Sequence, residues 1–203
     1  MAMTPVAIAT EDQLSEAIVL RLIAEVPGEP RVMHRLGKRG SGYLSSKMDS
    51  WRQMAEHQVM VVLTDLDRAN CLVEFRDKWL ANQPPPPGML FRVAVREVES
   101  WVLADHVAMR ELIGAKSVLP AKPDELAEPK QVLLRLANGA HKTVREELRK
   151  TIDGNLSQGL GYNARLSAWV ASSWSPQRAA ERSPSLARAR DRLREIVSVF
   201  GVT

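Results

Sequence analysis

Apolar residues are grouped along this chain in two patterns: short continuous runs and longer stretches with helical spacing. The run Val59–Leu63 is rich in β-branched residues and has no polar alternation, which is typical of a strand buried on both faces of a parallel sheet. Residues 5–9 and 89–95 form similar runs. Stretches with helical spacing cover 10–26 and 70–81. Alternating strands and helices predict an α/β fold with a mostly parallel, helix-covered sheet.

The pattern changes in the second half of the chain. A helix is expected from Glu99 to Ile113, and beyond Ser117 prolines separate short segments of helical character. Further helices are expected to begin at Lys130, to end near residue 150, to cover 162–174 and to follow Ser183. The sequence therefore predicts an α/β core over residues 1–115 and a helical C-terminal extension over 116–203, packed on that core.

Residues 29–50 carry several cations and glycines but little periodicity. A solvated loop followed by a helix over about 44–57 is one interpretation. The other is a mobile basic loop that approaches phosphates. The spacing of a P-loop is absent.

Composition narrows these possibilities. The chain has 203 residues and a net charge of +4, which permits an anionic partner. Cys71 is the only cysteine, so a disulfide framework and a cysteine-based zinc site are excluded. No apolar stretch is long enough to span a membrane, and the N-terminus lacks the plan of a signal peptide. We expect a soluble, cytoplasmic protein.

Acidic residues follow each predicted strand. Glu11 comes after the first, Asp65 and Asp67 end the central one, and Glu99 with Asp105 follows the third. Carboxyl ends of parallel strands meet at one edge of a sheet, and carboxylates gathered there are suited to a hard divalent cation. Two alternatives stay open: the aspartates cap the following helix, or Glu99 forms a structural ion pair with Arg96 or a neighbouring basic residue.

Several segments together resemble the Toprim domain. More narrowly, they are similar to an uncharacterised bacterial Toprim-like family related to the nuclease domains of OLD-type proteins. The segments are Thr10-Glu11, Leu63-Thr64-Asp65-Leu66-Asp67, the stretch from Arg96 to Asp105, Pro129-Lys130 and Ser183-Pro184-Ser185-Leu186.

The resemblance implies a nuclease that hydrolyses phosphodiester bonds with Mg²⁺ or Mn²⁺. Glu11, Asp65 and Asp67 would be metal ligands, and Glu99 and Asp105 would serve a second metal or orient the attacking water. Lys130 would stabilise negative charge on the phosphate. The alternative is that Lys130 is an exposed residue at the start of a helix and only a solvated charge. The resemblance implies two partners, a nucleic acid, above all DNA, and an ATPase protein. It also implies a role in phage defence or DNA processing.

The chain departs from the family pattern after its first strand. The family has a Glu-Gly-x-x-Glu pattern there, whereas this sequence has Ala7 to Ala9 followed by Thr10 and Glu11. A non-catalytic Toprim-like subunit that binds nucleic acid or a partner is therefore an alternative. A small-molecule phosphotransfer or nucleotide-handling enzyme on the same fold is a third.

Overall fold

The structure is a computed structural model that describes residues 4–200. Its contacts divide the chain into two units, which are described separately. The first holds the chain up to Ala94 together with the segment from Arg188 onward, and the second holds Val95–Ala187. The predicted boundary between residues 115 and 116 thus lies inside the second unit, and the last helix contributes residues to both units.

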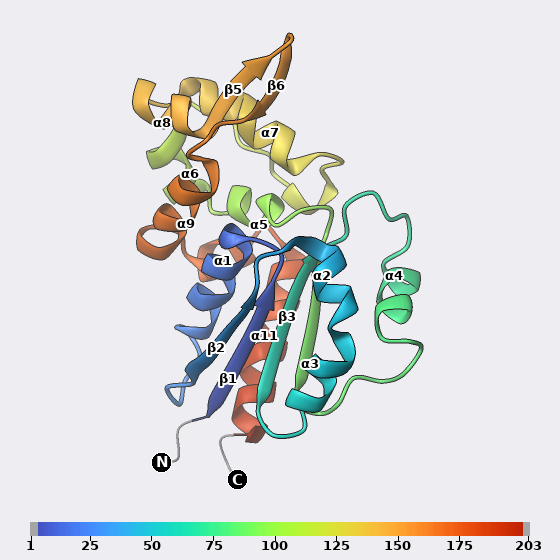
Figure 1. Cartoon of the computed structure of the whole chain (residues 1–203). Coiled ribbons are helices and arrows are strands. Elements are labelled where there is room, and N and C mark those ends of the chain that lie inside the picture. Colours follow the sequence, from blue (N-terminus) through green and yellow to red (C-terminus); the bar gives the residue numbers. More distant parts are fainter. Residues whose placement is uncertain (1–3, 201–203) are drawn as a thin grey trace. The chain divides into compact units, whose positions relative to one another are not determined.

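The first unit is built on a four-stranded, wholly parallel sheet (Figure 1). Its strands are β1 (Pro5–Thr10), β2 (Arg31–Gly37), β3 (Val59–Asp65) and β4 (Met89–Ala94), in the spatial order β2–β1–β3–β4. The α/β prediction is confirmed, and the three continuous apolar runs are strands β1, β3 and β4.

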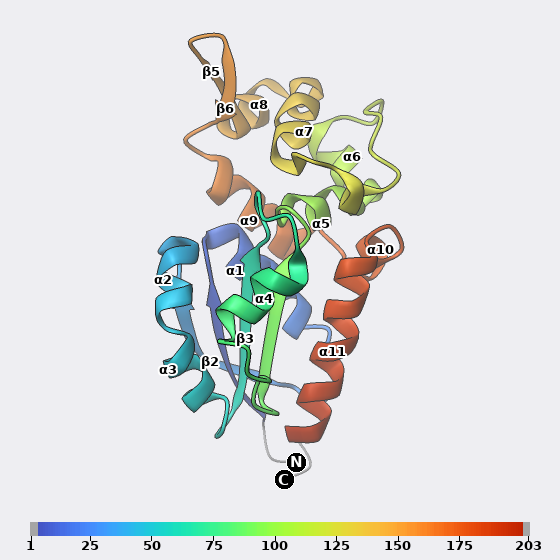
Figure 2. The ribbon, with the colours of Figure 1, turned by 90° about the vertical axis from the view of Figure 1, so that its right-hand side faces the viewer.

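Helices cover both faces of this sheet. Helices α2 (Gly40–Ser46) and α3 (Met48–Met54) lie on one face, whereas α1 (Gln13–Ile23) and α11 (Pro184–Phe200) lie on the other (Figures 1 and 2). Helix α4 (Leu72–Trp79) precedes β4. With both faces covered, the central strands need apolar side chains in both directions.

The core on the α2–α3 face is formed by alternate residues of the central strands. Ala7 and Ala9 of β1 and Met60 and Val62 of β3 pack there with Trp51, which is 4% exposed. The indole N–H of Trp51 donates to the carbonyl of Leu44 at 3.2 Å. This bond satisfies the polar atom of a buried tryptophan and joins α3 to α2.

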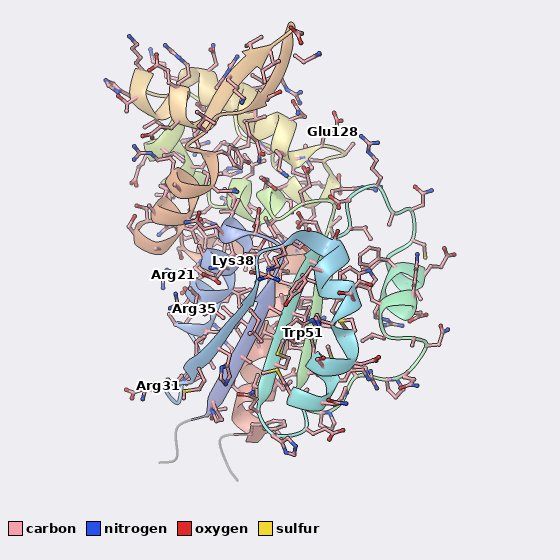
Figure 3. All side chains as sticks on the ribbon, viewed as in Figure 1. Arg21, Arg31, Arg35, Lys38, Trp51 and Glu128 are labelled. Atoms are coloured by element: carbon pink, nitrogen blue, oxygen red, sulfur yellow. The ribbon has the colours of Figure 1, made fainter. Side chains whose placement is uncertain are left out.

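The segment over 29–50 differs from the expected loop, because Arg31–Gly37 is strand β2. It pairs with β1 at the edge of the sheet, and Arg31 and Arg35 lie on its outer side (Figure 3). An edge strand has few buried side chains, so it lacks the apolar run that marks a central strand. The helix expected over 44–57 is likewise divided at Lys47 into α2 and α3.

The second unit is mostly helical. Its elements are α5 (Glu99–Ala104), α6 (His106–Ile113), the 3₁₀ turn η1 (Pro123–Glu125), α7 (Pro129–Leu136), the 3₁₀ turn η2 (Ala137–Gly139), α8 (Lys142–Leu148), β5 (Arg149–Ile152), β6 (Asn155–Gln158), α9 (Tyr162–Ser172) and α10 (Pro176–Ala180). The helix expected from Glu99 to Ile113 is two helices, because Asp105 has a non-helical backbone (φ −83°, ψ 84°).

Strands β5 and β6 form an antiparallel hairpin that periodicity did not predict. Its two-residue connection is Asp153-Gly154, and both residues have positive φ, at 49° and 78°. An Asp-Gly pair in this conformation is the preferred turn between two hairpin strands.

Substitution of Gly37 tests how the edge strand is attached. This residue has a φ of +95°, and a Cβ there would lie 2.8 Å from the backbone nitrogen of Thr10 and collide with the carbonyl oxygen of Thr10. We expect Gly37→Ala to lower the free energy of unfolding in urea by about 1–3 kcal/mol from backbone strain alone, with the collision adding to the loss.

Gly42→Ala is the matched control. Gly42 lies in α2, and a Cβ there meets nothing within 4 Å. This variant should be neutral or more stable by up to about 1 kcal/mol. Equal stability of the two variants would contradict the account of Gly37.

Candidate functional site

Glu11 and Asp65 meet at the carboxyl ends of β1 and β3. These strands are parallel neighbours, with Thr10 opposite Leu63, so the residues that follow them emerge at one edge of the sheet. The backbone N–H of Asp65 donates to Oε1 of Glu11 at 2.9 Å, and the hydroxyl of Thr64 donates to the same oxygen. Oε2 of Glu11 takes part in neither bond, so one carboxylate oxygen is held and the other is left for another contact.

The electrostatic environment of Glu11 works against its negative charge. Burial is the largest effect and raises the pKa of its carboxyl above the ordinary value. The bonds from Thr64 and Asp65 oppose this effect, and the negative charges of Asp67 and Asp12 add to it. A cation at this edge would offset both the cost of burying this charge and the repulsion from its neighbours.

The other two carboxylates of this edge have different surroundings. Asp12 is the N-cap of α1, where its Oδ1 accepts from the backbone N–H of Ser15 at 2.8 Å and from the hydroxyl of Ser15 at 2.7 Å. The sequence offers Thr10 as a cap for this helix as well, but the structure assigns that role to Asp12. Asp67 has a φ of 49°, a conformation that aspartate tolerates better than most residues.

The alternative in which Asp65 and Asp67 cap the following helix is not observed. Helix α4 begins at Leu72, and its N-cap is Cys71 without a side-chain capping bond. The two aspartates are therefore separated from this helix by a short loop.

A cavity of about 340 Å³ lies beside Asp65 and Asp67. Two cations, Arg68 and Lys78, line it, and neither forms an ion pair among residues 4–200. The rings of Phe75 and Trp79 also line it and are stacked on each other, with centroids 5.3 Å apart. Carboxylates, cations and aromatic faces thus border one open space.

The second unit contains a separate cluster around Glu99, which is 2% exposed. The ammonium of Lys130 lies 3.5 Å from Oε1 of Glu99 and 3.5 Å from Oε1 of Glu97. The Tyr162 hydroxyl donates to Oε1 of Glu99 at 2.8 Å. The backbone N–H of Lys130 donates to Oε2 of Glu97 at 2.8 Å, which places a carboxylate at the start of α7.

Burial is the largest influence on the pKa values of Glu99 and Tyr162 in this cluster. It raises the pKa of the Glu99 carboxyl, although Lys130 and Tyr162 act in the opposite direction. Burial and the neighbouring Glu99 raise the pKa of Tyr162 well above 10.0, so this hydroxyl stays a donor. Oε2 of Glu99 is buried without a hydrogen-bond partner among the described residues. The expected structural ion pair of Glu99 with a basic neighbour is present, and its partner is Lys130.

Asp105 is fully buried and engaged through both carboxylate oxygens. Arg178 binds it with two bonds, from Nε to Oδ1 at 2.8 Å and from Nη2 to Oδ2 at 2.7 Å. The backbone N–H of Ser175 donates to Oδ2 at 2.8 Å, and that of Ala108 to Oδ1 at 3.3 Å. These contacts join α6 to α10 and give Asp105 a structural role. Its carboxylate oxygens are both engaged by donors, which does not favour the predicted metal role.

The site residues predicted from the sequence therefore form two groups. Glu11, Asp65 and Asp67 belong to the first unit, and Glu99, Asp105 and Lys130 belong to the second. Among residues 4–200, there is no group of three or more histidine, cysteine, aspartate or glutamate side chains that could hold a metal ion by themselves.

Fold and site together define an α/β protein with a four-stranded parallel sheet and an acidic edge. Comparison of the chain with protein-family models, with curated proteins and with solved structures found no match. In the part of the chain that the structure describes, no helix is both long enough and apolar enough to cross a membrane.

Among the side chains that bind the predicted carboxylates, Thr64, Tyr162 and Arg178 were missed from the sequence, and so were the cations and aromatic rings of the cavity. Thr64 carried a signal, because it is a polar residue between the apolar run Val59–Leu63 and Asp65. Tyr162 and Arg178 reach their partners over 63 and 73 positions of the chain. No local pattern reports contacts of that range.

Replacement of Lys130 by methionine tests the balance of charge around Glu99. The variant leaves Glu97 and Glu99 without the neighbouring ammonium. We expect a loss of roughly 3 kcal/mol in unfolding free energy at pH 7, as for removal of one partner of a buried pair. The pKa of Glu99 is already raised in the fold, so its contribution to stability is present below about 4.5 and is lost as the pH rises through the folded value.

The loss in Lys130→Met should therefore be larger at pH 8 than at pH 5, as measured by urea unfolding at both values. Lys142→Met is the control, because Lys142 is 75% exposed and forms only a surface pair with Glu146. That pair should contribute at most about 0.5 kcal/mol. A pH-independent loss in Lys130→Met would show that its ammonium does not stabilise the Glu99 charge.

Proposed function

We propose that this protein is a Toprim-like nuclease that hydrolyses phosphodiester bonds with a divalent cation, Mg²⁺ or Mn²⁺. The observation that carries the proposal is the junction of β1 and β3, where Glu11 accepts a hydrogen bond from the Asp65 backbone beside a cavity lined by Asp65 and Asp67. The resemblance of these segments to the Toprim domain supports the same reaction. On the same resemblance, we propose that the protein acts with an ATPase partner in phage defence or DNA processing.

The chemistry of this edge fits a hard cation. Glu11, Asp65 and Asp67 offer only carboxylate oxygen, and burial and repulsion already disfavour the charge of Glu11. Mg²⁺ keeps several waters and is commonly held by one or two carboxylates together with substrate phosphates. A site with few protein ligands therefore suits Mg²⁺ better than an ion that needs a complete protein cage.

The surroundings suit a nucleic-acid substrate. Arg68 and Lys78 can contact phosphate oxygens, and the stacked rings of Phe75 and Trp79 can receive a base at the wall of the same cavity. The net charge of +4 favours approach of a polyanion.

The residues of this edge would divide the work. A bound cation would polarise a phosphoryl oxygen and make a water molecule a stronger nucleophile. Asp65 and Asp67 would hold that cation together with the Glu11 carboxylate, whose Oε1 is fixed by Thr64 and the Asp65 backbone. Arg68 and Lys78 would position the phosphate and balance its charge.

A non-catalytic Toprim-like subunit is the second candidate. The departure from the Glu-Gly-x-x-Glu pattern before Glu11 favours it, and so does the absence of three clustered ligands among residues 4–200. Such a subunit would bind nucleic acid or a partner without cutting. Catalytic roles for Glu99 and Lys130 stay predictions. Both residues belong to the second unit, whereas the proposed site is formed by residues of the first unit alone.

The deciding experiment measures metal binding and DNA cleavage on the same preparations. Wild type and Asp65→Asn/Asp67→Asn are compared for Mn²⁺ binding by calorimetry and for cutting of plasmid and single-stranded DNA with Mg²⁺ or Mn²⁺. We expect the double variant to lose both, with cleavage reduced about a hundredfold or more, because the predicted metal ligands are lost.

Asp191→Asn is the matched control, since Asp191 is an exposed aspartate on α11 with only a surface contact to Arg194. It should bind Mn²⁺ and cut DNA as the wild type does. Mn²⁺ binding without cleavage would favour the non-catalytic subunit. Cleavage that survives in the double variant would contradict the proposed site.

A further inference from the structure

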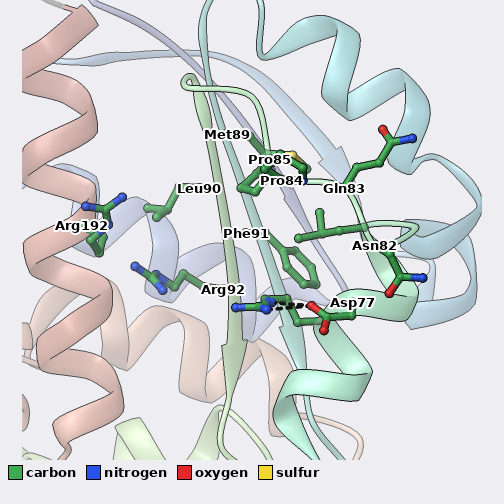
Figure 4. A pocket seen from close by; sticks show the side chains of 12 residues that line it. Asp77, Asn82, Gln83, Pro84, Pro85, Met89, Leu90, Phe91, Arg92 and Arg192 are labelled. Atoms are coloured by element: carbon green, nitrogen blue, oxygen red, sulfur yellow. Dashed lines mark hydrogen bonds and ion pairs between the residues drawn. The ribbon is translucent and has the colours of Figure 1, made fainter.

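A second cavity of the first unit lies at the free edge of β4, the last strand of the sheet. Its volume is about 420 Å³. Its walls are formed by α4, by Pro84 and Pro85 in the segment before β4, by β4 itself and by Arg192 of α11 (Figure 4). None of the residues of the acidic edge lines it.

Arg92 is the unusual residue of this cavity. It extends from β4 toward α11 (Figure 4), and its Nε is buried without a hydrogen-bond partner among the described residues. Burial lowers the pKa of its guanidinium, and the positive charges of Arg192 and Arg188 lower it further. Arg92 thus lies in the positive field of two other arginines of the same unit.

Acidic residues do not balance this charge. Asp77 lines the cavity, but its Oδ1 accepts from Nε of Arg76 at 3.0 Å and from Nη2 of Arg76 at 2.7 Å. Glu195 is held by Arg192. Neither Arg92 nor Arg188 forms an ion pair among residues 4–200. Three arginines, Arg76, Arg92 and Arg192, line the cavity against one acid, Asp77. Glu195 only partly opposes the effect of Arg188 and Arg192 on Arg92.

We propose that this cavity binds an oxyanion of the phosphate class, held by Arg92 and Arg192 with support from Arg188. A buried guanidinium nitrogen without an acceptor is destabilising, and arginine cannot avoid the charge by losing its proton. The planar guanidinium matches the oxygens of phosphate in pairs. An anion bound by the guanidinium of Arg92 would offset its buried charge and the repulsion from Arg188 and Arg192.

The phosphate could belong to a small molecule or to the backbone of a nucleic acid, since both present the same oxygens. The inference does not depend on the proposed function, because it involves neither the carboxylates nor the metal.

The test is thermal unfolding and calorimetry with inorganic phosphate against sodium chloride of equal ionic strength. Phosphate should raise the melting temperature of the wild type, because it binds the folded state alone. Arg192→Gln should weaken phosphate binding about tenfold or more. Arg92→Met should bind no phosphate and, without phosphate, should melt no lower than the wild type, because an unpaired buried charge has been removed.

Arg194→Gln is the control, because Arg194 is an arginine of the same helix with only a loose surface contact to Asp191. It should respond to phosphate as the wild type does. An equal response of the wild type and Arg192→Gln would mean that phosphate acts by general exclusion from the protein surface, and the inference would be overturned even if Arg92→Met failed to fold.

Fluorescence anisotropy with a labelled oligothymidylate identifies the source of the phosphate. Weaker oligonucleotide binding in Arg192→Gln, but not in Arg194→Gln, would support a nucleic-acid backbone. Unchanged oligonucleotide binding together with lost phosphate binding would support a small phosphate compound. If both ligands bind Arg192→Gln as tightly as the wild type, the inference fails. The Asp65→Asn/Asp67→Asn variant should keep phosphate binding, which separates this site from the acidic edge.

Discussion

The parallel pairing of β1 with β3 is the constraint on which the candidate site depends. Residues 6–9 of β1 are fully buried, and β3 is buried almost along its whole length. Their register runs without interruption from Val6 opposite Val59 to Thr10 opposite Leu63. A shift by one residue would turn every side chain to the other face. The position of Glu11 over the backbone of Asp65 is therefore held by the core.

The buried carboxylates of the second unit have partners of opposite charge within that unit. Asp105 has a bidentate arginine and two backbone donors, and Glu99 has a lysine and a tyrosine. Two charged groups of the first unit have no such partner among residues 4–200. Glu11 has a carboxyl whose burial is only partly offset by its hydrogen bonds, and Arg92 has a buried nitrogen with no acceptor among the described residues. A bound ion of opposite charge would supply the missing partner of each.

Sequence reasoning recovered the elements whose stability comes from burial. Strands β1 and β3 were predicted as apolar runs and β4 as a run that is apolar except for Arg92. Helix α7 was predicted because Pro129 can occupy a first helical turn. Strand β2 was missed because its side chains are largely exposed and its stability comes from backbone bonds to β1. The division of α5 from α6 was missed because the backbone at Asp105 is held by contacts with Ser175 and Arg178, about 70 positions away in the chain.

The same distinction explains what could be predicted of the site. The acidic residues after each strand were visible in the sequence. The contact between Glu11 and Asp65 could be predicted only by assuming that their strands are neighbours, as β1 and β3 are. The pattern alone could not separate these carboxylates from Glu99 and Asp105, which also follow a strand. What separates them is the set of groups around each carboxylate. Asp105 is saturated by donors and Glu99 is paired with the ammonium of Lys130, whereas Glu11 is held by two neutral donors and forms no ion pair among residues 4–200. A carboxylate that is fixed in place without a cationic partner is the kind that can accept a cation, and that property depends on the fold.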